Sequence, residues 1–455
     1  MRTVVVGNGM AAVALVERLV EHGVTDVTVL GEEPCAPYNR ILLSAVLEGS
    51  HRPGAISLRS ASWYAAHAVD LRLGTGVVAI HRSVQEVELA DGERVPYDRL
   101  VLAIGSIPEL PPIRGLVDAD GVMDERVHAF RTLADCDRLI AAASSASSAL
   151  IVGGGLLGLQ VARALGVRGM RAELVEVGDH VLRHQVDSQA GRILARSLEQ
   201  LGTAVYVGVR ATRLTPSGLR LDNGYELDAD LVVLTAGSRP RIRLASAAGL
   251  VTARGIVVDD TLATSDPHVF AIGDCAEHSG RTPGLVPPAW EQARILGDRF
   301  AGSPATYTGH RTVARLRATD LDVAVLGEPE TARGEVVQVS NPVTGTHKKL
   351  VVDGGVIVAA TLVGDLSRVG LITQAFDQRT VLAAGEPGEL LMTPRPSAPP
   401  ELPDDAEVCA CAGVSVGRVR ACSSLEELRE TTRATTGCGG CLSTCTNLLS
   451  QLVKG

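Results

Sequence analysis

Short runs of aliphatic residues, each followed at once by a helical spacing of apolar residues, occur twice along the chain. The first run is residues 4–6, and apolar positions then recur three or four residues apart up to Val20. The second run is residues 149–152, and a similar spacing follows up to Leu165. A short apolar run predicts a buried strand, and the wider spacing predicts a helix with one apolar face. We therefore predict two strand–turn–helix units.

The turn inside each unit carries small residues at the same spacings. These residues are Gly7, Gly9 and Ala12 in the first unit and Gly153, Gly155 and Gly158 in the second. Glycine lets backbone N–H groups approach a phosphate, and the following helix presents the positive end of its dipole there. The pattern predicts two binding sites for the pyrophosphate of a dinucleotide.

Each unit is followed by a further strand that ends in an acidic residue. Glu32 and Glu33 stand in this place after the first unit, and position alone does not choose between them. Glu176 stands there after the second unit. An acid about 20 residues beyond the first glycine is typical of ribose recognition. No Arg follows directly after Glu176 to meet a 2′-phosphate, which favours NADH over NADPH.

The pattern changes towards the C-terminus. Residues 306–390 contain short strand-like runs and are predicted to form a smaller α+β domain. Residues 391–406 are rich in proline, which favours an extended spacer, although a loop lying on the surface fits the same composition.

The composition and net charge of the chain exclude several classes of protein. The chain has 455 residues, of which 45% are hydrophobic and 21% charged, so several folded domains are expected. Its net charge of −9 argues against nucleic-acid binding. We find no apolar run long enough to cross a membrane and no N-terminal signal segment, and we expect a cytoplasmic protein.

Six of the nine cysteines lie between residues 409 and 445. Four of them form a Cys-x-Cys and a Cys-x2-Cys pair: Cys409, Cys411, Cys438 and Cys441. Four thiolates suit either one zinc ion or a [2Fe-2S] cluster, so we predict a metal site. Cys445 is either a further ligand or a buried small side chain.

Three glycines that end predicted strands complete the pattern: Gly105, Gly237 and Gly273, the last followed by Asp274. With both dinucleotide turns, they make residues 1–305 resemble the pyridine nucleotide oxidoreductases that carry two dinucleotide-binding domains. The resemblance implies an α/β fold with two Rossmann-like domains, one for FAD and one for NADH. The FAD domain would be split, as residues 1–118 and 240–305, around an NADH domain at 119–239.

The resemblance also implies site residues. Those expected at FAD are Gly7, Gly9, Ala12, Glu33, Arg40, Ser44, Gly105, Gly273 and Asp274. Those expected at NADH are Gly153, Gly155, Gly158, Glu176 and Gly237. No residue is assigned a catalytic acid–base role, because the cofactors carry the chemistry.

Residues 37–44, Pro-Tyr-Asn-Arg-Ile-Leu-Leu-Ser, indicate the branch of the family. Relatives with a redox disulfide carry Cys-x4-Cys here, and this chain has no cysteine in the segment, so a dithiol relay is excluded. The segment is similar to that of ferredoxin-type reductases and of the large subunit of NADH-dependent nitrite reductases. Arg40 and Ser44 would then lie near the flavin phosphates.

Residues 407–455 resemble the bacterioferritin-associated-ferredoxin-like [2Fe-2S] domain, a small helical domain. Ser415 and Ser424 are expected to begin two of its helices. The likeness favours [2Fe-2S], and zinc stays as the structural alternative.

Together these resemblances imply that electrons pass from NADH through FAD and the cluster to another protein. Because the sequence ends just after the cysteines, the electron-transfer subunits of assimilatory nitrate reductases fit better than a nitrite-reducing enzyme, and the partner would be the nitrate reductase catalytic subunit. A reductase for a ferredoxin, rubredoxin or oxygenase component is an alternative. An NADH or redox sensor is an alternative of another class. Residues 306–390 would allow a homodimer.

Overall fold

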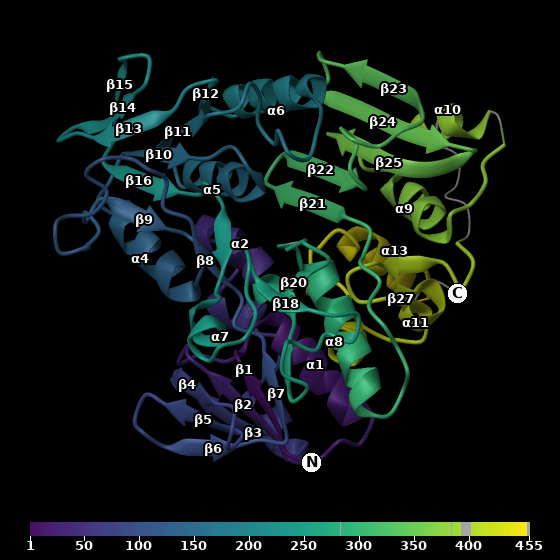
Figure 1. Cartoon of the computed structure of the whole chain (residues 1–455). Helices are drawn as coiled ribbons and strands as arrows, with labels where there is room; N and C mark the ends of the chain where they lie inside the picture. Colours follow the sequence, from purple (N-terminus) through teal and green to yellow (C-terminus); the bar gives the residue numbers. More distant parts are fainter. Residues whose placement is uncertain (283, 384, 393–401, 453–455) are drawn as a thin grey trace. The chain divides into compact units, whose positions relative to one another are not determined.

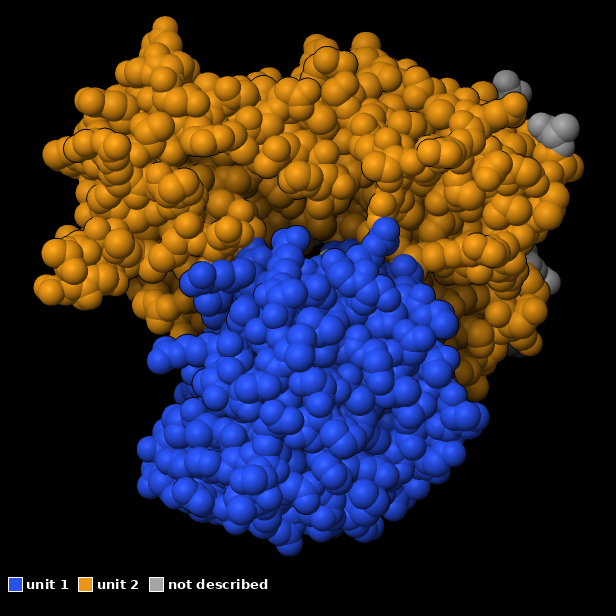
Figure 2. All heavy atoms as spheres, in the orientation of Figure 1, with its two compact units in different colours: residues 1–40, 53–107, 238–310 blue, residues 41–52, 108–237, 311–455 orange. Residues whose placement is uncertain are grey.

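The protein is described from a computed structural model, which covers residues 1–455 except 283, 384, 393–401 and 453–455. It divides into two compact units, blue and orange in Figure 2. Unit 1 comprises residues 1–40, 53–107 and 238–310, and unit 2 comprises residues 41–52, 108–237 and 311–455. Each unit contains a five-stranded parallel sheet of its own.

The sheet of unit 1 has the strand order β19-β7-β1-β2-β3. Its strands are β1 (Thr3–Val6), β2 (Val27–Gly31), β3 (Asp70–Leu73), β7 (Arg99–Leu102) and β19 (Val269–Ala271). Val4 pairs with Thr28 on one side and with Leu100 on the other. Every residue of β1 and β2 is buried, as expected for a parallel sheet covered on both faces. Helix α1 (Met10–Glu21) follows β1 and packs against α8 (Val286–Phe300) (Figure 1).

Smaller elements complete unit 1. An antiparallel sheet consists of β4 (Val77–His81), β5 (Glu86–Leu89) and β6 (Arg94–Pro96), and β18 (Ile256–Val258) pairs with β20 (Ala276–His278). Two short helices are α3 (Ala61–Ala66) and α7 (Arg243–Ala247). Strands β8 (Ser106–Pro108) and β17 (Ser238–Pro240) pair with each other where the chain leaves and re-enters the unit.

The parallel sheet of unit 2 has the order β12-β11-β10-β16-β9. Its strands are β9 (Val127–Ala129), β10 (Ser148–Val152), β11 (Arg171–Glu176), β12 (Ala204–Val207) and β16 (Leu231–Leu234). The helices that belong to it are α2 (Leu43–Glu48), α4 (Leu133–Ala143), α5 (Leu156–Val167) and α6 (Ser188–Gln200). An antiparallel sheet of β13 (Ala211–Leu214), β14 (Gly218–Leu221) and β15 (Glu226–Asp228) lies between β12 and β16 in the sequence.

A second, antiparallel sheet follows in unit 2, with the order β21-β22-β25-β24-β23. Its strands are β21 (Val313–Ala318), β22 (Leu321–Leu326), β23 (Glu335–Asn341), β24 (Thr346–Asp353) and β25 (Val356–Val363). Helices α9 (Val369–Gln378) and α10 (Glu386–Leu391) follow it. Ile372 and Phe376 of α9 share a buried core with Leu326, Leu350 and Leu362 of the sheet. This is the α+β arrangement expected from the short apolar runs.

The C-terminal segment has a small core of its own. It contains the strand pair β26 (Glu407–Cys409) and β27 (Val414–Ser415) and the helices α11 (Val416–Arg420), α12 (Leu425–Thr432) and α13 (Leu442–Leu452). Ser415 accepts a hydrogen bond from the N–H of Arg418, and Ser424 accepts one from the N–H of Glu427. Both serines therefore cap helices as expected.

The α/β class with Rossmann-like parallel sheets is confirmed. The proline-rich spacer expected at 391–406 falls largely on residues 393–401, which lie outside the described part. Among the helices described, none combines the length and the apolar character that a membrane crossing needs.

Candidate functional site

The first glycine turn, in unit 1, follows β1. Gly7 has a φ of +107°, and a Cβ added there would lie 2.2 Å from the carbonyl oxygen of Ala103, so only glycine fits. Gly9 is the N-cap of α1 and has nothing within 4 Å of an added Cβ. No side chain caps this helix, so its first N–H groups face an open space that suits a phosphate.

Two polar side chains contact Glu33, one of the two acids that follow β2. Glu33 accepts a hydrogen bond of 2.7 Å from the Tyr38 hydroxyl and forms an ion pair with Arg40. Burial lowers the pKa of Arg40, but the neighbouring Tyr38 oxygen and the carboxylates of Glu33 and Asp274 raise it by more. Glu32 instead pairs with Arg241 and its side chain is 68% exposed. The geometry thus favours Glu33 over Glu32 as the ribose ligand, and places Arg40 at this acid.

The Gly-Asp turn lies against the first glycine turn. Gly273 has a φ of +76°, and an added Cβ would lie 3.0 Å from the Cβ of Ala11. Its N–H donates to the side-chain oxygen of Gln292 at 2.8 Å, and Ser106 donates to Asp274 at 3.0 Å. Gly105, with a φ of +67°, precedes Ser106. Gln292 and Ser106 therefore orient the turn, although neither was singled out from the sequence.

Ala12 and Ser44 complete the residues expected at FAD. Ala12 is buried in the first turn of α1, where a larger side chain would disturb the helix–sheet packing. Ser44 lies in α2, which belongs to unit 2. Its expected position near the flavin phosphates stays a prediction.

The second glycine turn, in unit 2, has the same construction as the first. Gly153 has a φ of +113°, and an added Cβ would lie 2.7 Å from the oxygen of Thr235. At Gly158 an added Cβ would lie 1.9 Å from the oxygen of Gly153, whereas Gly155 has nothing within 4 Å. Gly155 is the N-cap of α5, again without a side-chain cap. Gly237, with a φ of +119°, follows β16 beside this turn.

Thr235 is a residue of this turn that the sequence analysis missed. Its hydroxyl donates to the carbonyl oxygens of Val152 and Gly153, both at 3.0 Å. These bonds tie the end of β16 to the turn after β10. A threonine at the end of an apolar strand gave no separate signal in the sequence.

Glu176 is buried at the end of β11. Its two carboxylate oxygens accept hydrogen bonds of 2.6 Å from the N–H groups of Gly154 and Gly178, and Arg183 Nε lies 3.2 Å away. A carboxylate has about four acceptor positions, so capacity remains for ribose hydroxyls.

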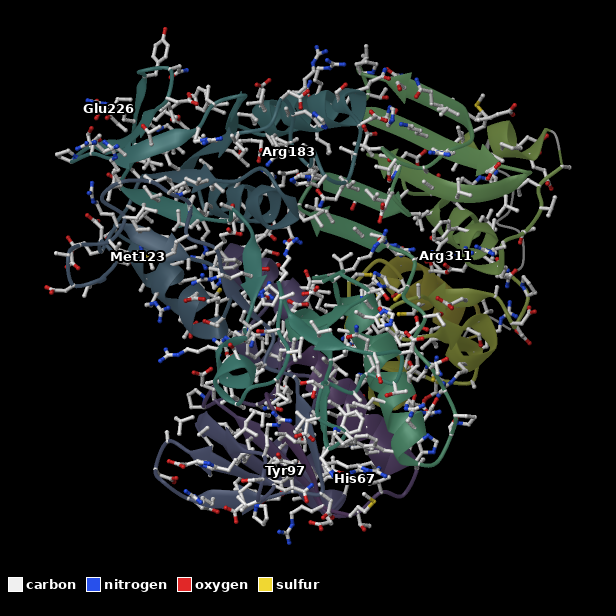
Figure 3. All side chains as sticks on the ribbon, viewed as in Figure 1. His67, Tyr97, Met123, Arg183, Glu226 and Arg311 are labelled. Atoms are coloured by element: carbon white, nitrogen blue, oxygen red, sulfur yellow. The ribbon has the colours of Figure 1, made fainter. Side chains whose placement is uncertain are left out.

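Arg183 corrects the argument against a 2′-phosphate. It lies in the loop between β11 and α6 and is labelled in Figure 3. A Cβ added to Gly178 would lie 2.2 Å from Arg183 Cδ, so this glycine makes room for the arginine to fold back onto Glu176. The absence of Arg directly after Glu176 therefore does not leave the ribose acid without a cation.

The cysteines outside the C-terminal segment offer no reactive thiolate pair. Burial raises the pKa of Cys136 to about 12 and that of Cys275 to about 11. Both thiols are therefore protonated at neutral pH and inert as nucleophiles. This agrees with the exclusion of a dithiol relay.

Three of the predicted metal ligands, Cys409, Cys411 and Cys441, belong to the core of the C-terminal segment, and with Cys438 they form two pairs. The Cys411 thiol donates to Cys438 at 3.1 Å, and Cys409 donates to Cys441, which in turn donates to Cys445. In the part of the chain that the structure describes, no three His, Cys, Asp or Glu side chains are arranged as a metal-ligand group. Each pair joins the Cys-x-Cys strand end to the Cys-x2-Cys turn.

The donor set nevertheless fits a metal–sulfur centre. Sulfurs around a tetrahedral metal at about 2.3 Å are about 3.8 Å apart, so the Cys411 and Cys438 sulfurs would have to separate by less than an ångström. The hydrogen bond from Cys411 lowers the pKa of Cys438 to about 6, and the charge of Arg315 and the N–H of Gly440 also lower it, against burial. Thiolate character and backbone N–H donors are what sulfur ligands need, and Cys438 has both. Donated hydrogen bonds and burial raise the pKa of Cys409, Cys411 and Cys441, so a bound metal would have to displace their protons.

Comparison with known proteins identifies a matching family and several similar proteins. The model of the pyridine nucleotide-disulphide oxidoreductase family matches residues 1–293. The nitrite reductase (NAD(P)H) of Bacillus subtilis is 34% identical over 457 residues, covering 96% of this chain and 56% of that protein. The assimilatory nitrate reductase electron transfer subunit of the same organism is 32% identical, covering 100% of this chain and 60% of that protein.

The chain thus spans little more than half the length of these curated relatives. Among solved structures, the covalent putidaredoxin reductase–putidaredoxin complex contains a similar chain, with a TM-score of 0.77 and 26% identity. That match covers 86% of this chain and 95% of the other. The resemblances stated from the sequence, to the oxidoreductase superfamily and to the two nitrogen-assimilation families, are confirmed.

Proposed function

Because the chain belongs to the pyridine nucleotide-disulphide oxidoreductase family, we propose that it passes electrons from NADH through FAD and a [2Fe-2S] cluster to a partner redox protein. Family membership assigns it to the NAD(P)H-dependent FAD oxidoreductases. The cluster, the acceptor and the cytoplasm as the place of action belong to the proposal.

The observation that carries the proposal is the pair of open glycine turns. Gly9 and Gly155 each begin a helix without a side-chain cap, and each leaves free space where a side chain would otherwise lie. A buried or half-buried acid follows each turn, Glu33 in unit 1 and Glu176 in unit 2. Two such sites on one chain suit two dinucleotides, one bound and one exchanged.

In this proposal the chain's own residues bind and orient the two dinucleotides. In unit 1, the N–H groups at the start of α1 would hold the FAD pyrophosphate, Glu33 the adenosine ribose, and Asp274 the ribityl part. In unit 2, the start of α5 and Glu176 would hold the same parts of NADH. When bound, NADH and FAD supply the hydride and electron chemistry. Each NADH releases two electrons and one proton, so two one-electron acceptors are reduced per turnover.

Four cysteines would hold the cluster: Cys409, Cys411, Cys438 and Cys441. Their sulfurs lie as two hydrogen-bonded pairs, and Cys409, Cys411 and Cys441 belong to a small apolar core. A [2Fe-2S] cluster takes two sulfurs on each iron, whereas zinc takes all four. The all-sulfur donor set together with a flavin domain favours the redox centre.

The acceptor that the relatives support best is the catalytic subunit of an assimilatory nitrate reductase. One relative, matched over the whole of this chain, is named as the electron transfer subunit of such an enzyme. A second candidate is a separate ferredoxin-type protein, because the similar solved chain comes from a reductase–redoxin complex.

An anaerobic titration with NADH tests the proposal. Flavin bleaching and the visible and EPR signals of a reduced [2Fe-2S] cluster should appear together as NADH is added. Adding the nitrate reductase catalytic subunit with nitrate should then reoxidise both centres, while subunit or nitrate alone should not. Reoxidation by a ferredoxin instead would select the second acceptor. Tight NADH binding without flavin reduction would refute the enzyme and favour a sensor.

A single variant separates the reduction of the flavin by NADH from the transfer of electrons through the cluster to the acceptor. C411S should keep NADH reduction of the flavin and lose the cluster signal and the transfer to the acceptor. Full transfer in C411S would show that the cysteines are not on the electron path.

A further inference from the structure

Arg315, on β21 of the antiparallel sheet, reaches the turn that carries two of the cysteines. A Cβ added to Gly440 would lie 2.9 Å from Arg315 Nη1 and 3.6 Å from Cys438 Sγ. The guanidinium therefore lies against the bare backbone of Gly440, on the same side as the Cys438 sulfur. A residue larger than glycine would displace it.

The rest of the arginine is held from the sheet side. Arg315 Nη2 donates to the Thr373 hydroxyl of α9 at 3.1 Å, and Thr373 itself donates to the oxygen of Val369 at 2.7 Å. Figure 1 shows the C-terminal segment beside α9, and α9 contacts β26. Arg315 is thus the polar bridge from the sheet and α9 to the cysteine turn within unit 2.

Two features of Arg315 are not explained by the fold. Its Nε is buried and has no hydrogen-bond partner among the described residues. Two acids, Asp377 of α9 and Glu407 of β26, lie in its surroundings, but in the described part of the chain no carboxylate forms an ion pair with it. A buried donor and a positive charge without a close counter-ion are costly unless they serve a negative group.

The cysteine turn is a candidate for that negative group, because the guanidinium and the Cys438 sulfur lie on the same side of Gly440. A cluster held by four thiolates carries net negative charge, and reduction adds one electron to it. A positive charge close by stabilises the reduced form more than the oxidised form, and it raises the reduction potential.

We propose that Arg315 is a positioning residue that docks the four-cysteine segment onto the antiparallel sheet and raises the reduction potential of the centre the cysteines hold. The part of this inference that concerns the reduction potential rests on the proposed function. The docking half concerns only protein contacts, so the two are tested separately.

Three variants of the full-length chain serve both tests. R315Q removes the charge, and R315K keeps the charge but loses the flat guanidinium that lies against Gly440. R420Q is the control, because Arg420 is in the same segment and pairs with Asp404. Wild-type FAD content in every variant shows that the chain has folded.

Hydrogen exchange followed by mass spectrometry tests docking. R315Q should exchange faster than wild type in β21, in the start of α9 and in residues 437–441, and R420Q should match wild type there. Unchanged exchange in R315Q would overturn the docking role. This measurement gives its answer whether the cysteines hold iron, zinc or no metal.

A redox titration followed by EPR tests the charge. At the solution potential where half of the wild-type cluster is reduced, the ratio of reduced to oxidised cluster in R315Q should fall by roughly three- to tenfold. R315K and R420Q should stay near wild type. An unchanged ratio in R315Q would overturn the electrostatic role, while a chain without any cluster signal would refute the proposed function and leave the exchange result standing.

Discussion

At the residue scale, the two kinds of glycine in each turn have different tasks. Gly7, Gly153 and Gly158 are required by the backbone around them, because an added Cβ would touch a carbonyl oxygen at 2.7 Å or less. Gly9 and Gly155 face open space and have ordinary negative φ values. The first kind maintains the fold, and the second kind leaves open space in which the proposed function places a pyrophosphate.

This difference predicts that G155V folds but binds NADH poorly. Its side chain would occupy the space left for the pyrophosphate, so flavin reduction at low NADH should slow by about tenfold or more. Stopped-flow absorbance at the flavin band measures the rate. FAD content and thermal stability should remain those of wild type. G158V is the contrasting variant and should lose folded yield, because its side chain meets the Gly153 oxygen.

A second prediction at this scale concerns the choice of nicotinamide cofactor. Arg183 is 42% exposed and lies at the acid that would bind the ribose, so it can meet a 2′-phosphate there. R183Q should lower kcat/KM for NADPH relative to that for NADH by roughly threefold or more, as expected for a screened charge pair. R192Q, on the exposed side of α6, is the control. An equal effect on both cofactors would contradict this role.

Local rules predicted the glycines well and the polar partners poorly. A strand–turn–helix unit determines within a few residues where only glycine fits, so Gly7 and Gly153 could be found from the sequence. Glu32 and Glu33 end the same strand, and only the positions of Arg241 and Arg40 distinguish them. The fold-back of Arg183 depends on the gap at Gly178, which no spacing rule describes.

At the element scale, helix α6 is anchored through its N-cap residue, Asp187. Asp187 accepts a hydrogen bond from the N–H of Ala190 and lies 3.4 Å from His347 and 3.2 Å from Lys349 of β24. Burial alone would raise the pKa of Asp187, but the close His347 ring, the hydrogen bond from the N–H of Ala190 and the nearby Lys349 lower it well below its usual range. One carboxylate thus connects the parallel sheet's helix to the antiparallel sheet.

This connection predicts a stability that depends on pH. Because the folded-state pKa of Asp187 is below the unfolded value of about 4, its contribution is complete above about pH 5 and is lost as the pH falls below 4. D187N keeps a good N-cap and loses the charge, so it should be less stable than wild type by about 1–2 kcal/mol at pH 7. The difference should shrink on acidification, measured by urea unfolding from pH 7 to pH 3.

D187A serves as the companion variant. It also removes the N-cap, which should cost about 1 kcal/mol more than D187N at every pH. A difference between wild type and D187N that does not change with pH would show that the carboxylate charge is not the cause.

At the scale of the whole molecule, electrons have to leave the flavin by way of the cysteine segment if the proposed function holds. C438S should therefore leave the flavin reducible by NADH at the wild-type rate but stop reduction of the partner protein. C422S is the control, since the Cys422 thiol lies in the same core but donates to the oxygen of Arg418 rather than to another cysteine. Loss of flavin reduction in C438S would contradict separate tasks for the two regions.

The sequence predicted the domains of the chain better than it predicted the contacts between distant segments. Repeated strand–turn–helix units predicted two Rossmann-like domains, and short strand-like runs predicted an α+β domain where the antiparallel sheet lies. The spacing of the cysteines already grouped Cys411 with Cys438 in one predicted site, whereas the approach of Arg315 to Gly440 joins residues far apart in the sequence. Such long-range contacts depend on how the domains pack, and a single sequence carries no periodicity that reports it.

The path of the chain between the two units also bears on how the protein forms during synthesis. The chain crosses from one unit to the other five times, and β19, the last strand of the first parallel sheet, comes from residues 269–271. The ribosome has therefore released every strand of the second parallel sheet, from β9 to β16, before the first sheet can close. We therefore expect the second parallel sheet to be complete before the first. Until β19 is synthesised, the N-terminal strands lack an edge partner and are accessible to chaperones.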